Sequence, residues 1–283
     1  MSILKLKPSC KDYIWGGHRL AEEYNVLFEG RSPAEAWELG THCDRFEDFP
    51  ILIKFIDARD NLSIQVHPDD RYARQNEAQY GKTEMWYVMD AGKDAFLYYG
   101  FKREISREEF ADRIMNDTLT EVLNAVPVQK GDVLFIEAGT IHAIGKDILI
   151  AEIQQNSNVT YRVYDYGRIG KDGKKRDLHI EKALAVTKRI PVVKDRNCYP
   201  HIADCDYFTV DKLNLDGRVM QKLAGKVSEA SFASILILEG EGTISGREET
   251  LSYRKGDSFF LLFSSIQRGK FHTGLTSISL PAA

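Results

Sequence analysis

The sequence predicts a mainly β protein, either a sandwich or a barrel, and three observations support this. Short segments of alternating apolar and polar residues, separated by turn residues, run through most of the chain. The clearest helical pattern is confined to residues 106–116. A seven-residue segment at 130–136 recurs without gaps at 255–261, which indicates two related β units.

Local patterns predict the individual elements. Alternation predicts strands at residues 49–58, 63–67, 85–89, 95–99, 132–136 and 148–153. The helix at 106–116 is expected to begin with a capping box, because Ser106 can cap its first turn and Glu109 lies three residues later. Residues 119–124 extend this helix or form a second helical turn. Residues 170–175 form an exposed loop whose charge run reflects solvation.

Bulk composition describes an ordinary soluble protein. The chain has 283 residues, enough for one large or two ordinary domains, with 43% hydrophobic and 28% charged residues. The net charge of −4 predicts neither nucleic acid nor an anionic membrane as a partner. Any phosphate site must therefore be a local cluster of lysine and arginine.

Targeting signals and cysteine spacing predict a reducing compartment. Residues 1–11 lack the apolar run of a signal peptide, and no stretch approaches the length of a membrane span. The four cysteines, Cys10, Cys43, Cys198 and Cys205, show neither a CxxC pair nor the spacing of a disulfide framework. We expect reduced thiols in a cytoplasmic protein and assign none of them to a metal.

Three segments carry residues that could bind a divalent metal. Gln65 and His67 lie two apart in one segment, so both side chains leave the same face of a strand. Glu84 follows in a second segment, and His142 lies at a turn in a third. Each histidine alone is more often an ordinary hydrogen-bonded residue. Two imidazoles, a carboxylate and an amide oxygen together form a ligand set that a small β-barrel can gather around one metal.

These segments, in this order, resemble the type I mannose-6-phosphate isomerases in their short bacterial form, a family of zinc-dependent cupins. The motifs are QVHP at 65–68, KTEMWY at 82–87, GTIHAIG at 139–145 and TYRVYD at 160–165. The resemblance continues at 13–17 and 35–39 and so covers most of the chain. One departure is Glu137, where the family usually has proline.

The resemblance implies two cupin-like jelly-roll β-barrels, with a small helical insertion around residues 104–124. The repeat at 255–261 is similar to the second cupin motif, but its continuation places Gln267 where His142 stands in the first copy. The second copy has thus lost its ligands. We expect a metal-bearing catalytic domain at 1–195 and a smaller metal-free β-domain at 196–283, joined through residues 191–195.

The family implies an enzyme that interconverts mannose 6-phosphate and fructose 6-phosphate by moving a proton through an enediol(ate). It also implies one Zn²⁺ per chain, with Gln65, His67, Glu84 and His142 as ligands. A metal of this kind can stabilise negative charge on a substrate oxygen.

The resemblance also implies catalytic and substrate-binding residues. Lys82 shares a strand face with Glu84 and is expected beside the metal, where it transfers a proton or holds substrate oxygens. Glu152 is its expected partner in proton transfer, and Arg162 is expected to stabilise the enediolate or grip the phosphate. Ser63 and Arg168 are weaker candidates for binding the substrate.

Two other classes of function remain open. One is a different metal-dependent cupin enzyme, such as an iron oxygenase, and the other is a sugar-phosphate-binding cupin without turnover. Oxygen uptake with iron would indicate the first, and binding without turnover the second. The sequence leaves open the oligomeric state and the strictness of sugar specificity.

The lost ligands of the second copy generate a prediction. Gln267→Ala should leave the zinc content and the kinetic constants nearly unchanged, because the second copy lacks the histidines that a metal site needs. Metal analysis and steady-state kinetics would check this. A drop in zinc would mean that the C-terminal unit reaches into the active site.

Overall fold

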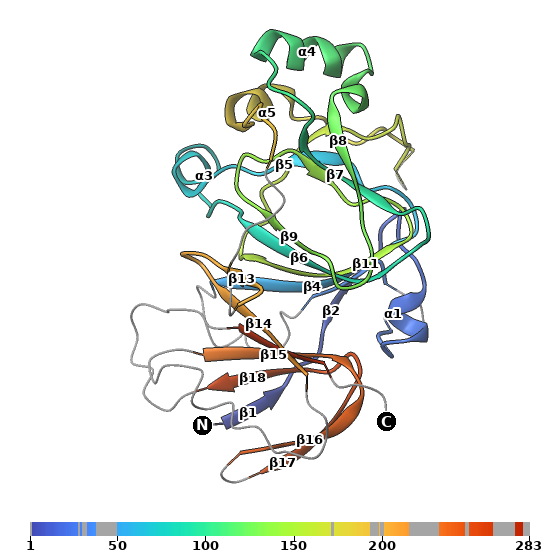
Figure 1. Ribbon diagram of the computed structural model, residues 1–283, viewed down its shortest axis with the longest axis vertical. Helices are drawn as coiled ribbons and strands as arrows, with labels where there is room; N and C mark the ends of the chain where they lie inside the picture. Colours follow the sequence, from blue (N-terminus) through green and yellow to red (C-terminus); the bar gives the residue numbers. More distant parts are fainter. Residues whose placement is uncertain are drawn as a thin grey trace.

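The computed structural model describes residues 2–27, 29, 33–37, 50–170, 173–192, 198, 201–214, 232–246, 249–262 and 275–279. Within them the protein is mainly β, as the sequence predicts. Three large sheets are stacked along the long axis of the molecule, and short helices lie mostly at one end (Figure 1).

A six-stranded antiparallel sheet forms the middle layer. Its strands are β2 (Ser9–Lys11), β3 (Glu35–Trp37), β4 (Ile51–Ala58), β6 (Glu84–Ala91), β9 (Val133–Ile136) and β11 (Ile148–Gln155). Their spatial order is β2-β3-β4-β11-β6-β9. In the two central strands, β4 and β11, all eight residues of each strand are buried. This sheet is therefore covered on both faces.

A five-stranded antiparallel sheet faces one side of the middle layer. Its strands are β5 (Ile64–Val66), β7 (Phe96–Phe101), β8 (Leu123–Pro127), β10 (His142–Ala143) and β12 (Tyr161–Tyr164). Their order is β12-β5-β10-β7-β8. Helices α4 (Arg107–Met115) and α5 (Ile180–Val186) lie on its outer side (Figure 1). Phe110 and Leu184 of these helices pack in one core with Ile64 and Phe101 of the sheet.

The C-terminal half covers the other side of the middle layer. Its sheet contains β1 (Ser2–Lys5), β13 (Ala203–Asp204), β14 (Thr209–Asn214), β15 (Phe232–Glu239), β18 (Ser258–Leu262) and β19 (Leu275–Ser279), in the order β1-β18-β15-β19-β14-β13. A hairpin of β16 (Glu241–Ser245) and β17 (Thr250–Arg254) extends from it. Phe208 and Phe232 share a core with Phe55 and Met85 of the middle sheet.

The N-terminal strand belongs to the C-terminal sheet. Residues 2–5 form β1, which pairs with β18 in antiparallel register. The sequence places these residues in the catalytic half, so the chain crosses between the two halves near its start. The division at residue 195 remains a prediction.

The alternation of β11 explains how polar side chains come to lie inside. Leu149, Ala151 and Ile153 face the core shared with the C-terminal sheet. Ile148 and Ile150 face the core shared with the five-stranded sheet. Since side chains alternate along a strand, Glu152 must face the same side as Ile148 and Ile150. The Glu152 carboxylate therefore lies in the space between the middle sheet and the five-stranded sheet.

The predicted strands are confirmed as β4, β5, β6, β7, β9 and β11, each within two residues at either end. The mainly β class is confirmed as well. Among the described residues the pairings give separate sheets whose outer strands do not pair with each other, so the two closed barrels remain a proposal.

The predicted helix is confirmed as α4, but its capping box is only half formed. The Ser106 hydroxyl accepts the Glu109 N–H at 3.0 Å. The Glu109 carboxylate binds the Arg103 guanidinium instead of the Ser106 backbone. The second helical turn expected at 119–124 is found as a 3-10 turn, η1 (Leu119–Glu121), and it is shorter than predicted because β8 begins at Leu123.

In the described part of the chain, three further helices were not predicted. They are α1 (Arg19–Glu22), α3 (Asp70–Asn76) and α5. The sequence treats Asp69 and Asp70 as turn residues, whereas Asp69 caps α3 by accepting the Tyr72 N–H at 2.8 Å. A single Asx cap before a seven-residue helix gives a weak signal, which the preceding Pro68 obscures.

Some expectations fall outside the described residues. These are Gln267, Cys43, residues 38–39 of the family motif, residues 171–172 of the expected loop, and residues 193–195 of the linker expected at 191–195. The described cysteines, Cys10, Cys198 and Cys205, form no disulfide with one another. None of the helices in the described ranges has the length and apolar character needed to cross a membrane.

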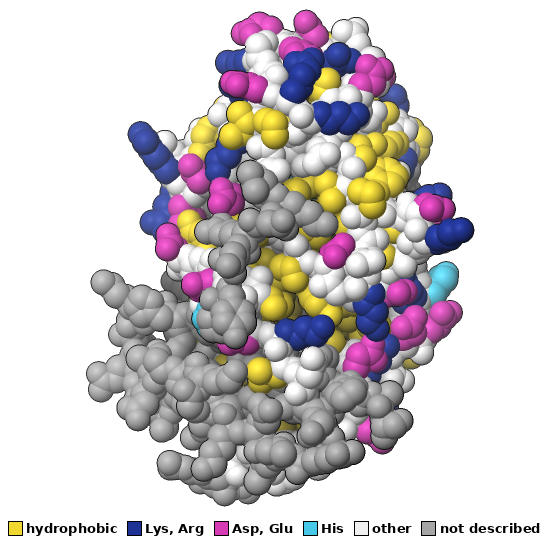
Figure 2. Space-filling model, in the orientation of Figure 1, with side chains coloured by type: hydrophobic (Ala, Val, Ile, Leu, Met, Phe, Trp, Pro, Cys, Tyr) yellow, Lys and Arg dark blue, Asp and Glu magenta, His cyan; other side chains and the backbone are white. Residues whose placement is uncertain are grey.

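Charged side chains of both signs are interspersed on the face seen in Figure 2, most densely around the α4 end. Apolar side chains break this pattern in the middle of the same face. The described side chains on this face therefore form no extended field of a single sign, which agrees with the modest net charge of −4.

The capping contact of α4 generates a prediction about stability. Ser106→Ala should destabilise the protein by about 1 kcal/mol, because the Glu109 N–H loses its acceptor. The melting temperature should fall by about 2–4 °C, and Ser106→Asp, which can still cap, should restore it. Thermal denaturation measures both. An unchanged melting temperature in Ser106→Ala would contradict the assigned cap.

Candidate metal centre and active site

A cavity of about 550 Å³ lies between the middle sheet and the five-stranded sheet. Charged side chains from both sheets line it. Its polar lining residues are Lys11, Tyr13, Glu35, Lys54, Ser63, Gln65, Lys82, Glu152, Ser157, Asn158, Thr160, Arg162 and Arg176. Two of these, Gln65 and Lys82, also contact a buried cluster of titratable groups behind the cavity.

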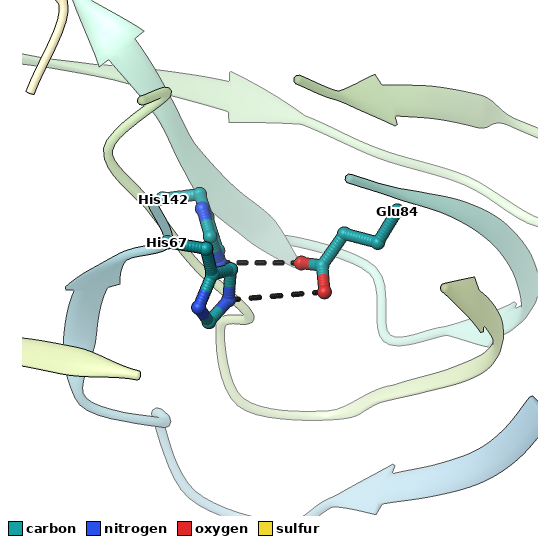
Figure 3. Close-up of side chains that lie close together, drawn as sticks. All are labelled: His67, Glu84 and His142. Carbon is teal, nitrogen blue, oxygen red and sulfur yellow. Dashed lines mark ion pairs between the residues drawn. The ribbon is translucent and has the colours of Figure 1, made fainter. Parts of the chain in front are cut away.

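That cluster consists of His67, Glu84 and His142, whose ligand atoms all lie within 4.8 Å of one another. Figure 3 shows both imidazoles directed at the carboxylate. His142 Nε2 lies 3.3 Å from Glu84 Oε1, and His67 Nε2 lies 3.8 Å from Glu84 Oε2. None of the three side chains exceeds 1% exposure, so solvent does not compensate for their polarity.

Strand geometry brings the three residues together. His142 of β10 pairs with Gln65 of β5, and His67 follows the end of β5. Glu84 is the first residue of β6 in the opposite sheet. Gly81 lets this segment approach closely, since an added Cβ would lie 2.4 Å from the Asp69 backbone. The cluster therefore bridges the two sheets.

Backbone contacts fix the tautomer of each histidine. His67 Nδ1 lies 2.8 Å from the Val159 carbonyl, and His142 Nδ1 lies 2.9 Å from the Thr140 carbonyl. Because a carbonyl only accepts, each Nδ1 must carry the proton. Each Nε2 then directs a lone pair at the centre of the cluster, the arrangement that metal-binding histidines adopt.

The cluster fits a metal ion. His67 Nε2 and Glu84 Oε1 are buried and have no hydrogen-bond partner in the described part of the chain. Burial lowers the pKa of His67 well below its usual range and that of His142 to about 4, and Lys82 adds to both shifts. Burial and the nearby Glu152 raise the pKa of Glu84 to about 7. Neutral imidazoles around a carboxylate that lacks a full countercharge are a typical donor set for a divalent cation.

Gln65 lies beside this cluster without completing it directly. Its Nε2 lies 3.5 Å from His142 Nε2, where the amide N–H donates to the lone pair that the assigned tautomer leaves on the imidazole. Rotating the amide by 180° would turn its oxygen toward the cluster, and such flips are assigned from the hydrogen-bond network. The role of Gln65 as a fourth ligand remains a prediction.

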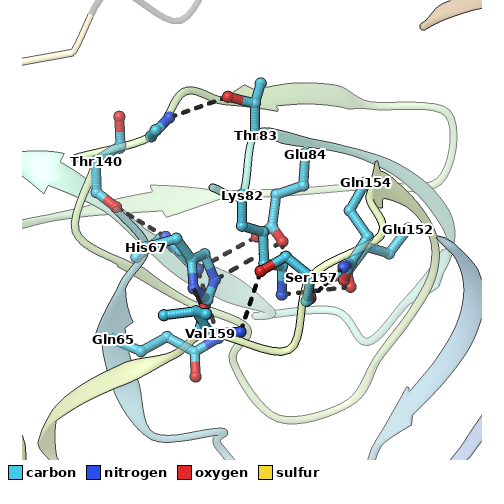
Figure 4. A network of polar contacts seen from close by, with 12 residues as sticks. Gln65, His67, Lys82, Thr83, Glu84, Thr140, Glu152, Gln154, Ser157 and Val159 are labelled. Atoms are coloured by element: carbon cyan, nitrogen blue, oxygen red, sulfur yellow. Dashed lines mark hydrogen bonds and ion pairs between the residues drawn. The ribbon is translucent and has the colours of Figure 1, made fainter. Parts of the chain in front are cut away.

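A row of alternating charges leads from the cluster across the middle sheet, and Figure 4 shows its first members, Glu84, Lys82 and Glu152. Lys82 Nζ lies 3.1 Å from Glu84 Oε2 and 3.9 Å from Glu152 Oε1. Lys54 Nζ donates to Glu152 Oε1 at 2.9 Å, and the Trp86 indole donates to Oε2 at 3.0 Å. The strand register explains the row, since Glu152 is paired with Lys54 on one side and Trp86 on the other.

These neighbours keep Glu152 ionised. Burial alone would raise its pKa, but Lys54 and Lys82 outweigh burial and lower the pKa to about 2. Burial likewise opposes the charge of Lys54, and Glu152 together with Glu35 raises the Lys54 pKa above its usual value. Sequence reasoning missed both Lys54 and Glu35. Lys54 lies on the same face of β4 as the apolar Ile56, so the local sequence does not mark Lys54 as a site residue. Its role becomes visible only when β4 is paired with β11, which places it opposite Glu152.

Arg162 reaches into the same cavity from β12. Its Nε donates to the Ser63 hydroxyl at 3.2 Å, and its Nη1 donates to the Asp177 carbonyl at 3.0 Å. The neighbouring Tyr161 faces the other way, where it is buried and donates to Glu77. Burial and the nearby Arg176 lower the pKa of Arg162.

Arg168 does not line the cavity. Its guanidinium donates to the Asn61 carbonyl and to Asp165, and it lies over the Tyr166 ring. Arg176 also donates a hydrogen bond to Asp165 and, unlike Arg168, it lines the cavity. Sequence reasoning missed Arg176 because it belongs to the charged stretch that follows the expected loop. Glu137, at the family's usual proline position, is half-exposed and lies 3.2 Å from Lys188.

Comparison with known proteins finds two matching family models. The catalytic domain of type I phosphomannose isomerases matches residues 35–91, and the cupin domain of mannose-6-phosphate isomerases matches residues 200–268. Mannose-6-phosphate isomerase ManA of Bacillus subtilis is 35% identical over 300 residues, with 91% of this chain and 92% of that protein covered. The mannose-6-phosphate isomerase of Streptococcus mutans is 33% identical over 298 residues, with the same coverage.

Solved structures agree with this assignment. The mannose 6-phosphate isomerase of Bacillus subtilis matches with a TM-score of 0.76 at 26% identity, covering 93% of this chain and 95% of that chain. A putative mannosephosphate isomerase from Archaeoglobus fulgidus has the same fold, with a TM-score of 0.66 at 20% identity and 92% and 90% coverage. With identity of this level over nine-tenths of its length, the chain belongs to the type I mannose-6-phosphate isomerases.

Proposed function

We propose that this protein interconverts mannose 6-phosphate and fructose 6-phosphate in the cavity between its two N-terminal sheets. The observation that carries the proposal is a buried two-histidine, one-carboxylate cluster next to a cavity lined by Lys54, Lys82 and Arg162. The relatives named above carry out this isomerisation according to their names. A sugar phosphate and an enediolate are both anionic, so cationic side chains suit the ground state and the intermediate.

The proposed cofactor is one zinc ion per chain. His67, Glu84 and His142 would hold it, and Gln65 would add a neutral oxygen after its amide turns. Imidazole and carboxylate donors suit zinc, although they also suit iron. When bound, the ion supplies Lewis-acid stabilisation for negative charge on a substrate oxygen.

The reaction moves one proton between C1 and C2 of the open-chain sugar. We assign this transfer to Lys82 and Glu152 as a pair, since their charged atoms lie 3.9 Å apart. A carboxylate with a pKa near 2 is a weak base alone, and an ammonium is an acid. Glu152 would begin the reaction deprotonated, able to accept the proton, and Lys82 would begin protonated, able to donate one. Lys54 and Trp86 hold Glu152 in place for this role.

Arg162 is the proposed stabiliser of the enediolate oxygen, and Ser63 orients it through the contact with Nε. Arg168 remains a weaker candidate for substrate binding. Its guanidinium would have to leave Asp165 or the Asn61 carbonyl to reach a ligand in the cavity.

The finer architecture is also part of the proposal. We infer two cupin-like jelly-roll barrels, a zinc-bearing one at 1–195 and a metal-free one at 196–283, with the helical insertion around 104–124. The lack of a disulfide among the three described cysteines supports the proposal of a reducing, cytoplasmic location. No nucleic acid or membrane partner is proposed.

Metal analysis combined with a coupled assay for fructose 6-phosphate tests the function. Zinc near one per chain with turnover is the expected result. Iron with oxygen uptake would favour an oxygenase, and sugar-phosphate binding without turnover would favour a binding protein. Either of these results would contradict the proposal.

Substitution of a ligand should remove the metal. His142→Ala should lower the zinc content well below one per chain, and activity should fall with it, because no neighbour can replace the imidazole. His201→Ala is the matched control, since this histidine pairs with Asp211 in the C-terminal half. Elemental analysis of both proteins provides the comparison. A folded His142→Ala protein with full zinc would show that the ligand set is wrong.

Removal of Arg162 should slow catalysis without loss of metal. Arg162→Ala should lower kcat by roughly a hundredfold, equivalent to about 3 kcal/mol, with little change in KM. Arg162→Lys should restore little of this, because the planar fork is lost. Steady-state kinetics at matched zinc content would measure the change. Wild-type kcat and KM in Arg162→Ala would show that this side chain does not act on the substrate.

A further inference from the structure

Two chain segments that carry the buried cluster run side by side behind the cavity. One is the turn at residues 67–70, which begins with His67, and the other is the stretch at 81–84, which ends with Glu84. The Lys82 N–H donates to the Pro68 carbonyl at 3.0 Å. The strands that lead into and out of these segments, β5 and β6, belong to different sheets, so strand pairing does not hold them together. The distance between the two proposed ligands therefore depends on the contacts between the segments.

Gln155, the last residue of β11, holds the second segment by both backbone groups of one residue. Its backbone N–H donates to the Thr83 carbonyl at 3.1 Å. Its side-chain Oε1 accepts the Thr83 N–H at 2.8 Å. Because Thr83 lies between Lys82 and Glu84, Gln155 fixes the backbone from which both of these side chains project.

Asp70 connects Gln155 to the first segment. Its Oδ1 accepts from Gln155 Nε2 at 2.9 Å and from the Gly81 N–H at 2.8 Å. Since an ionised carboxylate only accepts and the Thr83 N–H only donates, these two partners fix which way the Gln155 amide points. Asp70 is the first residue of α3 and follows His67 by three positions. Asp70, Thr83 and Gln155, here called the clasp, thus join the segments of both proposed ligands.

The turn that follows Gln155 reaches the first ligand from its other side. The Ser157 N–H donates to the Gln155 carbonyl at 2.7 Å, and its hydroxyl accepts the Val159 N–H at 3.2 Å. The same hydroxyl donates to the Tyr80 carbonyl at 2.8 Å. The Val159 carbonyl is the group that fixes the tautomer and direction of the His67 ring (Figure 4). Gln155 therefore stands between the backbone of one proposed ligand and the hydrogen-bond acceptor of the other.

We propose that Gln155, held by Asp70, is a positioning residue for the metal centre and for Lys82. This assignment rests on the proposed function for the presence of zinc. Gln155 is buried, and neither Gln155 nor Asp70 lines the cavity. Both residues therefore act on the reaction through the side chains that they position. Groups that orient metal ligands typically change metal affinity or activity by about 10–100-fold when they are removed.

The first test is the zinc dissociation constant, measured by competition with a chelator in wild type and Gln155→Ala. The constant should rise about tenfold or more, because the backbone of Glu84 is no longer held against the turn at 67–70. At saturating zinc, kcat should fall by about tenfold or more, while KM stays within about threefold. An unchanged dissociation constant together with an unchanged kcat would overturn the proposal.

A cobalt-substituted protein separates positioning from a general loss of stability. The visible absorption of bound Co²⁺ depends on the geometry of its ligands. The spectrum of folded Gln155→Ala should therefore differ from that of wild type. A wild-type spectrum in a variant that is only less stable would show that Gln155 supports the fold and does not position the ligands.

A double variant tests whether Asp70 acts through Gln155. Asp70→Ala should raise the zinc dissociation constant by a smaller factor than Gln155→Ala. In the double variant the constant should rise by less than the product of the two factors, because both changes open the same clasp. A rise equal to that product would contradict the link between the two residues. If Gln155→Ala does not fold, Asp70→Ala carries the test, since this side chain is 29% exposed.

Thr187→Val is the matched control. Thr187 is buried like Gln155, its hydroxyl donates to the Ala183 carbonyl at 2.7 Å, and it does not line the cavity. The variant also loses a buried hydrogen bond, but it should keep the zinc dissociation constant, the cobalt spectrum and the kcat of wild type. A rise in its zinc dissociation constant equal to that of Gln155→Ala would overturn the proposal.

The two proposals fail in different ways. A wild type that binds zinc without isomerising the sugar would contradict the proposed function alone, and the zinc dissociation constant of Gln155→Ala would still decide the role of the clasp. An active, zinc-loaded wild type whose Gln155→Ala variant matches it in zinc affinity, cobalt spectrum and kcat would contradict the clasp alone. A wild type with no affinity for zinc would contradict both.

Discussion

Glu84 is buried between two neutral imidazoles, and the surrounding structure depends on how its charge is balanced. Burial of an ionised carboxylate without a full countercharge costs several kcal/mol. Lys82 at 3.1 Å supplies part of that charge, but Glu84 Oε1 and His67 Nε2 have no hydrogen-bond partner among the described residues. A divalent cation bound between them would be coordinated by both the Glu84 oxygen and His67 Nε2. Metal binding would therefore stabilise the contact between the two sheets that hold the cluster.

The covered middle sheet makes such a site possible. Alternate residues of β4, β6 and β11 face the C-terminal half, where apolar side chains form the larger core. The other residues face the cavity, so charged groups such as Lys54 and Glu152 can occupy a fully buried strand. Because they are paired across neighbouring strands, each charge is compensated within the sheet. The C-terminal half thus supports the site without lining most of it.

Sequence reasoning predicted those parts of the site that local motifs encode. Gln65, His67, Glu84 and His142 lie in short motifs with strand or turn signals, and the structure brings them together as a cluster with Gln65 beside it. Lys54 and Arg176 were missed because their roles depend on pairing and on an Asp165 contact that no local pattern encodes. The pairing of β1 with β18 joins residues at opposite ends of the chain, and strand alternation carries no information about partners so far apart.

Anomalous diffraction from crystals of the protein, recorded above and below the zinc absorption edge, tests the central claim most directly. The account predicts one strong peak per chain that appears only above the edge, within bonding distance of His67 Nε2, His142 Nε2 and the Glu84 carboxylate, about 2.0–2.2 Å away. It also predicts that the Gln65 oxygen, rather than its nitrogen, faces the peak. A peak at another place, or a purified active enzyme with no metal between these three side chains, would contradict the account.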